Sequence, residues 1–297
     1  MDSTLHPDPG AVPSPGRTAG PKRNIRLDIE YDGQNYSGWQ WQPHLPTLEG
    51  AIKTAIETMV DHPITLYSSG RTDAGVHAEQ HVAHFFSHTT LPSRNLMHGL
   101  NSLLSSDVSI YHVQDMPLTW RARHDALERE YRYVLYNSPV APALLRHYVY
   151  WVRDSLCIEA MQEAARAFIG EHDFSAFRSS QCDAPSPIRK LYEVSLHAHL
   201  PFIAINLRGT AFLRHQVRTI AGTLLQVGLG AIPPSAIPDI LLSKNRRRAG
   251  PTLPAQGLTL VAVRYPDDPE ELRSRPTLSR LFQNGYPIPP GSSLYIK

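Results

Sequence analysis

Residues 70–78 read Gly-Arg-Thr-Asp-Ala-Gly-Val-His-Ala, and they carry the clearest chemical signal in the chain. Asp73 follows the cationic Arg71 and the hydroxyl of Thr72, and two small residues come directly after it. A nearby arginine holds a carboxylate ionised and orients it, while small residues let a ligand approach closely. A carboxylate placed in this way can act as a nucleophile, as a general base, or only as the aspartate of a turn.

A second candidate lies in the tyrosine-rich segment around Tyr131, for which we predict a strand over 131–136. Tyr131 and Tyr133 are two residues apart and therefore share one face of that strand. An aromatic ring on an open sheet face is a platform on which a base can stack. Tyrosines are also frequent in strands for packing alone, so either role is open for each of them.

The segment from about Thr210 to Gly228 has the pattern of a helix. Arg214 and Arg218 are four residues apart and share a face of it, opposite an apolar stripe. Such arginines usually solvate a helix, but they can also reach a carboxylate or a phosphate. Gly222 follows Arg218 by one turn and permits close approach of another element.

Two further groups of residues suggest binding functions. Basic residues cluster in 121–132 and in 244–248, which suits a polyanion as well as an ordinary solvated surface. His77, His81 and His84 suggest a metal. If 80–86 is a strand, His77 and His81 face one way and His84 the other, which makes three ligands on one metal hard to arrange. We therefore predict no metal site.

The elements that must position these residues follow a repeated order. The first half is predicted as strand, helix, two strands, helix and strand, at 25–31, 47–59, 64–67, 81–86, 93–104 and 108–113. The second half has a similar order, at 131–136, 156–169, 191–197, 202–207, 210–228, 237–242 and 258–265. Both orders are those of ferredoxin-like (RRM-like) folds, which predicts an α+β protein of two such halves.

The composition of the chain indicates where its folded part begins and ends. We predict a disordered Pro/Gly-rich tail over 1–23, an N-terminal half over 24–117 with the Asp73 loop, a C-terminal half over 118–266, and an irregular extension over 267–297. The net charge is +2, so a nucleic-acid surface requires local clustering. The two cysteines have no metal spacing, and the N-terminus lacks the apolar stretch of a signal peptide. These features predict a cytoplasmic protein.

Several segments together resemble the tRNA pseudouridine synthase A (TruA) family. The most specific of them is the nine-residue motif at 70–78, whose Thr72-Asp73 differs from the Leu-Asp of related synthase families. The matching segments occur in the family's order between about residues 25 and 265. They are Ile29 to Gly33, Gly38 to Gln40, residues 70–78, Arg129 to Tyr136, Phe212-Leu213, Val217-Arg218, Gly222, and Pro254 to Leu258.

The resemblance implies a homodimeric enzyme that isomerises uridine to pseudouridine at positions 38, 39 and 40 in the anticodon arm of tRNA, without cofactor or metal. By the same resemblance, Asp73 is the catalytic nucleophile and Tyr131 stacks on the target base. Arg71 and Arg218 surround the aspartate and the flipped nucleotide. The implied fold is a continuous mixed sheet flanked by helices. Gln216 and Leu253 depart from the family's usual methionine and alanine.

Two other functions fit parts of the sequence. A non-catalytic RNA-binding module built on paired sheets would make Asp73 dispensable. A carboxylate-dependent glycosidase acting on nucleosides would need a second carboxylate, for which Glu79 is the nearest candidate.

Overall fold

The computed structural model describes residues 20–266, 268, 269 and 272. Its helices are α1 (Leu48–Val60), α2 (Ser93–Leu103), α3 (Ile158–Arg166), α4 (Gln216–Gly228) and α5 (Ile237–Ser243). Its strands are β1 (Arg23–Tyr31), β2 (Leu66–Ser68), β3 (His77–Ser87), β4 (Val108–Met116), β5 (Glu128–Asn137), β6 (Tyr150–Val152), β7 (Gly170–Asp173), β8 (Ile188–His199), β9 (Phe202–Gly209) and β10 (Leu258–Arg264).

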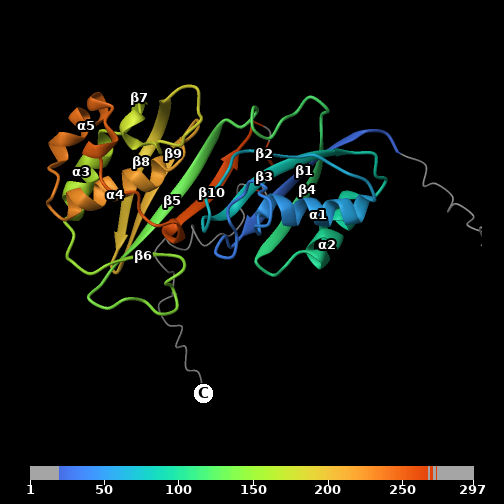
Figure 1. Cartoon of the computed structure of the whole chain (residues 1–297), viewed down its shortest axis with the longest axis horizontal. Helices are drawn as coiled ribbons and strands as arrows, with labels where there is room; N and C mark the ends of the chain where they lie inside the picture. Colours follow the sequence, from blue (N-terminus) through green and yellow to red (C-terminus); the bar gives the residue numbers. More distant parts are fainter. Residues whose placement is uncertain (1–19, 267, 270–271, 273–297) are drawn as a thin grey trace, which may run out of the picture.

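All the strands of the described residues belong to one mixed sheet of ten, which confirms the predicted α+β class. The sheet follows the long axis of the molecule, with α1 and α2 at one end and α3, α4 and α5 at the other (Figure 1). Its order is β4-β1-β3-β10-β5-β9-β8-β7, while β2 pairs with β3 and β6 pairs with β5.

The sheet contains the same strand arrangement twice. In the first half the spatial order is β4-β1-β3-β2, and in the second half it is β10-β5-β9-β8. In both, the fourth strand lies beside the first, and the first beside the third, as the strand-helix-strand-strand-helix-strand order predicts. The last strand, β10, joins the halves, because it runs parallel to β3 and antiparallel to β5.

Two hydrophobic clusters form the core. One is built around α1, α2 and β1, and the other around α3, α4 and β9. Leu258 and Leu260, two residues apart in β10, belong to different clusters, so the clusters meet across this strand. Tyr131 packs against both of them. The strand that closes the sheet therefore also places Tyr131 at the junction of the two cores.

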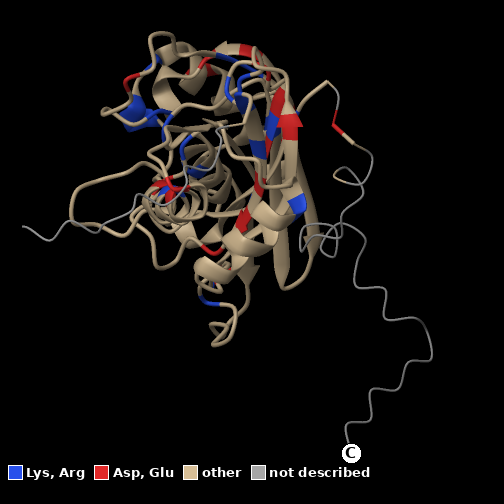
Figure 2. Ribbon diagram, turned by 90° about the vertical axis from the view of Figure 1, so that its right-hand side faces the viewer, with Lys and Arg blue, Asp and Glu red and all other residues tan. Residues whose placement is uncertain are grey.

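A buried charged network fixes the N-terminal part of the sheet. Arg26 donates two hydrogen bonds to Asp28, at 2.9 and 2.8 Å, and a third to Asp268 at 2.7 Å. Figure 2 shows acidic and basic positions next to one another on the strands of the sheet. Since each buried charge is paired and hydrogen-bonded, the network ties the chain that follows β10 to β1.

The structure corrects several boundaries. The helix predicted from Thr210 begins only at Gln216, because His215 adopts a left-handed backbone conformation with φ of 67°. The short strands β6 and β7 were not predicted, and α3 is shorter than expected. The N-cap predicted at Thr47 is confirmed by a bond from the Gly50 amide to the Thr47 hydroxyl at 3.3 Å.

The predictions for the two tails concern residues that lie almost wholly outside the described part of the chain. In that described part, no helix has both the length and the apolar character needed to cross a bilayer.

Candidate active site

The Asp73 loop connects β2 with β3 and is held by the N-terminal core. The Trp39 amide donates to the Thr72 carbonyl at 3.1 Å, and the hydroxyls of Tyr31 and Thr72 bond at 2.8 Å. Trp39 in turn stacks on His81 with the ring centroids 3.8 Å apart. Gly75 turns the chain with φ of 77°, a conformation that favours glycine. The backbone just before Asp73 is therefore fixed by buried partners, and the turn after it is made by Gly75.

Three basic side chains surround the Asp73 carboxylate. Arg218 Nη1 donates to Oδ2 at 3.0 Å. His215 Nε2 lies 3.5 Å from the same oxygen, and Arg214 Nε lies 3.9 Å from Oδ1. These are the side chains in ion-pair range of Asp73 in the described part of the chain. The Asp73 side chain is 25% exposed, so solvent and a ligand can reach it.

Arg218 is rigidly positioned by α4 and by the segment that precedes β10. Its Nε donates to the Leu253 carbonyl at 2.7 Å, and the Leu253 amide donates to the Arg218 carbonyl at 3.3 Å. The side chain is only 15% exposed. Arginine can donate from several nitrogens in a fixed fork, so Arg218 bonds Leu253 and Asp73 at once. Of the two partners that the spacing left open for Arg218, a carboxylate and a phosphate, the structure shows the carboxylate of Asp73.

Gly222 allows the close approach on which this geometry depends, as the sequence predicted. A Cβ at position 222 would lie 1.9 Å from the Pro251 carbonyl oxygen, which is a backbone atom. We expect Gly222→Ala to lower the free energy of unfolding by about 1–3 kcal/mol, because the clash outweighs alanine's higher helix propensity. Chemical denaturation with a two-state fit measures this loss.

Gly70→Ala is the matched control for stability, because a Cβ at position 70 would meet nothing within 4 Å and its φ is not in the left-handed region. We expect its unfolding free energy to stay within about 0.5 kcal/mol of the wild type. Equal stability of the two variants would contradict the close packing of α4 on residues 250–253.

Tyr131 is brought near the Asp73 loop by the register of β10. Leu260 pairs with Ala78 of β3 on one side and with Tyr131 of β5 on the other. Ala78 and Tyr131 are therefore two strand spacings apart, about 10 Å. Tyr131 is half-buried, with its ring edge-to-face on Phe212 at 5.1 Å. Burial, and to a smaller extent the Asp73 charge, raises the pKa of Tyr131 to about 12, so its hydroxyl stays protonated.

Tyr133 is a packing residue. Its ring is fully buried in the core, and its hydroxyl donates to the Pro254 carbonyl at 2.8 Å. Burial raises its pKa well above the usual range. Of the two candidate platforms, Tyr131 is the one that is not fully buried.

The structure does not place Arg71 where the sequence suggested. Its side chain is 57% exposed and faces Asp183, with Nη1 3.8 Å from Oδ2 of a carboxylate that is 90% exposed. Thr72, between Arg71 and Asp73, turns its side chain inward to Tyr31, while the Arg71 side chain extends into solvent. The cations at Asp73 come instead from α4 and the residues just before it. A role of Arg71 toward a nucleotide stays a prediction.

Sequence reasoning assigned no contact to His215 and expected Arg214 on a helix. Both lie in the turn before α4, where the Arg214 carbonyl accepts from the Ser179 amide at 3.0 Å. Gln216 shapes this turn, since its Oε1 accepts from the Leu213 amide at 2.8 Å. The sequence feature that could have indicated these contacts is Arg214-His215-Gln216, one turn before Arg218. No pattern indicated that the helix starts at Gln216.

Many of the basic residues predicted to bind a polyanion instead form hydrogen bonds or ion pairs with other residues of the protein. Arg129 donates to four backbone carbonyls, including those of Ser69 and Thr210. Arg132 is buried and bonds Asn206 at 2.7 Å. Lys244 pairs with Asp173 at 2.9 Å. Arg246 donates to Gly250 and Thr252. The basic residues of these clusters that are exposed are Arg123, Arg247, Arg248 and, despite its ion pair, Lys244.

The histidines of β3 are separated by a bulge between Ala78 and His81, which interrupts the strand alternation on which their predicted faces depended. His77 contacts Asp32 at 3.0 Å and Tyr148. His81 stacks on Trp39, and His84 packs against Trp120. Over the described residues, no three His, Cys, Asp or Glu side chains form a group that could hold a metal ion.

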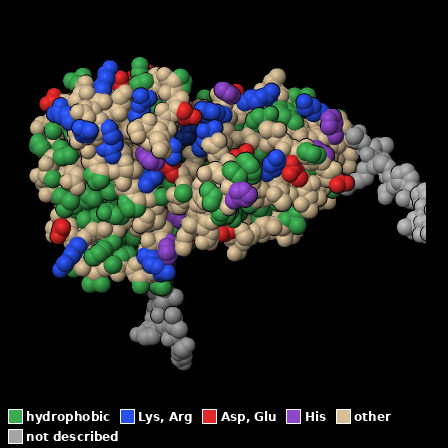
Figure 3. Space-filling view, viewed as in Figure 1, with side chains coloured by type: hydrophobic (Ala, Val, Ile, Leu, Met, Phe, Trp, Pro, Cys, Tyr) green, Lys and Arg blue, Asp and Glu red, His purple; other side chains and the backbone are tan. Residues whose placement is uncertain are grey.

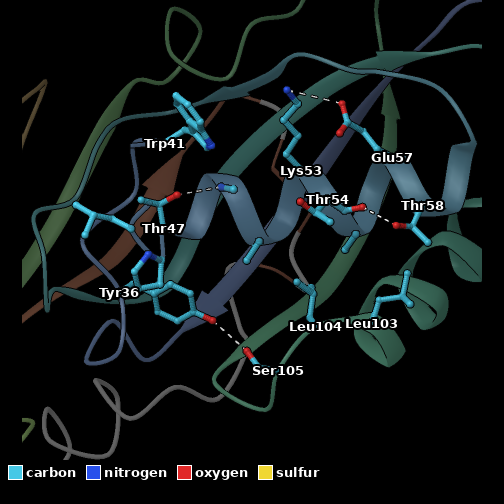
Figure 4. Close-up of a pocket in the computed structure, with 15 residues that line it drawn as sticks. Tyr36, Trp41, Thr47, Lys53, Thr54, Glu57, Thr58, Leu103, Leu104 and Ser105 are labelled. Carbon is cyan, nitrogen blue, oxygen red and sulfur yellow. Dashed lines mark hydrogen bonds and ion pairs between the residues drawn. The ribbon is translucent and has the colours of Figure 1, made fainter. Parts of the chain in front are cut away.

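A cavity of about 730 Å³ lies elsewhere, beside α1 and the end of α2. Its lining includes Tyr36, Trp41, Lys53 and Leu103 (Figure 4). Neither Asp73 nor Tyr131 contributes to it. The candidate site is therefore defined by its side chains and not by this cavity.

The chain is similar to known proteins over most of its length. A family model described as tRNA pseudouridine synthase matches residues 164–266. The chain is 46% identical over 243 residues to tRNA pseudouridine synthase A of Geotalea uraniireducens, covering 82% of this chain and all of that protein. It is 38% identical over 252 residues to the protein of the same name from Legionella pneumophila, covering 85% and 96%. This chain belongs to the tRNA pseudouridine synthase A family.

Among solved structures, a Cbf5–Nop10–Gar1 complex matches at a TM-score of 0.28 and 13% identity, covering 69% of this chain and 54% of that one. At this score the likeness carries no conclusion about the function of the chain.

Proposed function

We propose that this protein isomerises uridine to pseudouridine in tRNA, at positions 38, 39 and 40 of the anticodon arm. The observation that carries the proposal is the Asp73 carboxylate, which Arg218 bonds at 3.0 Å in the loop that leads into β3, two strand spacings from the half-buried Tyr131. Membership of the tRNA pseudouridine synthase A family, and the names of relatives that match over their whole length, support the tRNA substrate.

The reaction breaks the N1–C1′ bond of uridine and forms a C5–C1′ bond, while C5 loses its proton and N1 gains one. It needs a carboxylate that stays charged while water is excluded. The cationic side chains of Arg218 and Arg214 stabilise such a charge in Asp73, and the imidazole of His215 lies beside them. Three routes are compatible with this position of Asp73: attack of the carboxylate on C1′, its attack on C6, and removal of the C2′ proton in a route through a glycal.

The target base must leave its stack to meet Asp73, which costs a few kcal/mol. Stacking on an aromatic ring contributes about 1–3 kcal/mol per base and offsets part of this penalty. We propose that Tyr131 provides the ring, with Arg218 beside the flipped nucleotide and Arg71, extended into solvent, at its phosphate side.

The decisive experiment incubates the full chain with unmodified tRNA transcripts and maps pseudouridine by carbodiimide modification and primer extension. We expect pseudouridine at positions 38, 39 and 40 in transcripts that carry uridine there. A transcript with cytidine at all three positions is the control. Tight tRNA binding without any pseudouridine would favour the RNA-binding module instead.

Tyr131→Ala should lower kcat about 10- to 100-fold, because the flipped base then lacks its stacking partner. The affinity for tRNA should change little, since most of it comes from phosphate contacts. Single-turnover assays at saturating enzyme measure the first quantity and filter binding the second.

Tyr131→Phe is the matched control, because it keeps the ring and removes only the hydroxyl. Most of the activity should remain if stacking is the role of this residue. Loss of activity in the Phe variant equal to that in the Ala variant would assign the role to the hydroxyl instead.

The charge of the substrate, the cellular location and the oligomeric state are proposed together with the function. Figure 3 shows Lys and Arg side chains gathered along the upper part of the displayed face, a distribution that supports a polyanionic substrate. A cytoplasmic location is supported by the tRNA substrate and by the free thiols of Cys157 and Cys182. We propose a homodimer that grips one tRNA with both subunits, which sedimentation equilibrium tests directly.

The glycosidase alternative receives no support from the site. Glu79 lies buried within β3, and the charged neighbours of Asp73 in the described chain are basic. Hydrolysis by two carboxylates requires the second one at the reacting bond.

A further inference from the structure

The two oxygens of the Asp73 carboxylate have different surroundings. Oδ2 receives the Arg218 hydrogen bond at 3.0 Å and has His215 Nε2 at 3.5 Å. Within the described part of the chain, the one charged group beside Oδ1 is Arg214 Nε at 3.9 Å, beyond hydrogen-bonding distance, and the Arg214 side chain is 49% exposed. Oδ2 is therefore held on the protein side, and Oδ1 is the oxygen left for a substrate.

One hydrogen bond to a carboxylate does not fix its plane, because the terminal torsion of an aspartate side chain is broad. A second donor that approaches Oδ2 from another direction restricts this rotation. His215 meets this requirement, since Arg218 reaches Oδ2 from within α4 and His215 reaches it from the turn before the helix.

The backbone at His215 is held in an unfavourable conformation that serves this contact. Its φ of 67° lies in the left-handed region, which costs a non-glycine residue free energy. The turn is stabilised on both sides, by the Leu213 amide bond to Gln216 and by the Thr219 amide bond to the His215 carbonyl at 2.9 Å. Strain of this kind persists where surrounding contacts enforce it and is concentrated at functional sites.

We propose that His215 is a positioning residue that, together with Arg218, anchors Oδ2 of Asp73 and presents Oδ1 to the uridine. The inference rests on the proposed function and deepens it, because it names the reacting oxygen and a further residue for the same reaction. The contact exceeds hydrogen-bond length in the free protein, as is common for catalytic contacts that tighten only with substrate bound.

The protonation state of the His215 imidazole agrees with this role. Burial and the positive charges of Arg218, Arg214 and Arg246 lower the pKa of His215, while Asp73 opposes this shift. The imidazole is thus neutral near pH 7 and can donate from Nε2 without adding a charge that would weaken the carboxylate as a nucleophile.

Two substitutions separate the side-chain contact from the backbone strain. Asparagine tolerates the left-handed conformation but is too short to reach Asp73, whereas glutamine places an amide nitrogen near the position of Nε2 but is unfavourable in this conformation. If His215 positions Asp73, His215→Asn should lower the single-turnover rate about 10- to 100-fold and His215→Gln should stay within about 5-fold of the wild type. Both should keep the Kd for tRNA within about 3-fold.

A purely structural role predicts the reverse order, with Asn at least as active as Gln, and that order would overturn the proposal. His44 provides matched controls, because it also has a left-handed φ, of 63°, and is exposed in the loop before α1. His44→Asn and His44→Gln should leave the rate unchanged.

A third variant keeps the test decisive even if the glutamine variant folds poorly. His215→Gly removes the side chain and relieves the strain, and added imidazole should restore its rate in a saturable manner, while His44→Gly should show no response. If the wild type is active, if imidazole restores no activity to His215→Gly, and if His215→Gln is no faster than His215→Asn, this inference is overturned and the proposed function is not. A wild type that forms no pseudouridine would overturn the proposed function and the inference with it.

Discussion

Asp73→Asn should abolish pseudouridine formation, with a loss in kcat of about 1,000-fold or more. The substitution preserves the shape of the side chain and removes its charge and its capacity to attack or to accept a proton. The Kd for tRNA should stay within a few-fold, because removal of one negative charge between Arg218, His215 and Arg214 does not weaken binding of a polyanion. Single-turnover assays on unmodified transcripts provide the rate, and filter binding provides the Kd.

Asp154→Asn is the matched control for this loss. It makes the same change of charge at an exposed carboxylate, and the bond from Asn137 goes to the backbone carbonyl of Asp154, which the substitution keeps. Its rate should equal that of the wild type. Substantial turnover in Asp73→Asn, with the protein shown to be folded by circular dichroism, would exclude Asp73 as the catalytic carboxylate and with it the proposed mechanism.

Arg218→Ala should lower kcat about 100-fold or more, because preorganised charge beside a reacting group accounts for losses of this size. The variant loses the 3.0 Å bond to Asp73 and also the bond to the Leu253 carbonyl, which is then left without this donor. Stability should fall by about 1–3 kcal/mol for the same reason. Rate and unfolding free energy, measured on one preparation, separate the two effects.

Arg218→Lys and Arg166→Ala complete this experiment. Lysine keeps the charge but cannot bond Leu253 and Asp73 together through a planar fork, so we expect partial recovery of the rate. Arg166 is an exposed arginine in the last turn of α3, and its replacement should leave the rate unchanged. A fully active Arg218→Ala variant would show that the ion pair with Asp73 has no part in the reaction.

Local patterns in the sequence were sufficient for much of the fold. The alternation in residues 25–31 and the capping threonine before α1 correctly predicted the first strand and helix, because both depend on neighbouring residues. The repeated order of elements predicted two ferredoxin-like halves, and the strand order observed in each agrees with it. The motif at 70–78 made Asp73 the candidate reactive group, because its residue types are themselves the signal.

Several predictions failed where a specific side-chain contact, a backbone turn or the strand pairing, and not the residue pattern, decided the outcome. The helix expected from Thr210 begins at Gln216, because the side chain of Gln216 bonds the Leu213 amide and His215 turns left-handed. Arg71 was expected at Asp73 from its proximity in sequence, yet its guanidinium faces Asp183. The bulge after Ala78 changed the face of His77, which strand periodicity could not reveal.

The sequence by itself determined which groups can react and which elements carry them, since residue identity and local periodicity are encoded in short stretches of chain. Only the tertiary structure decided which cations meet Asp73, because Arg218 lies 145 residues away from it and is aligned by α4. The same holds for Tyr131, which lies two strands from the end of the Asp73 loop because β10 pairs with β3 and β5 at once. Such distant pairings depend on the packing of both cores, a property of the whole chain.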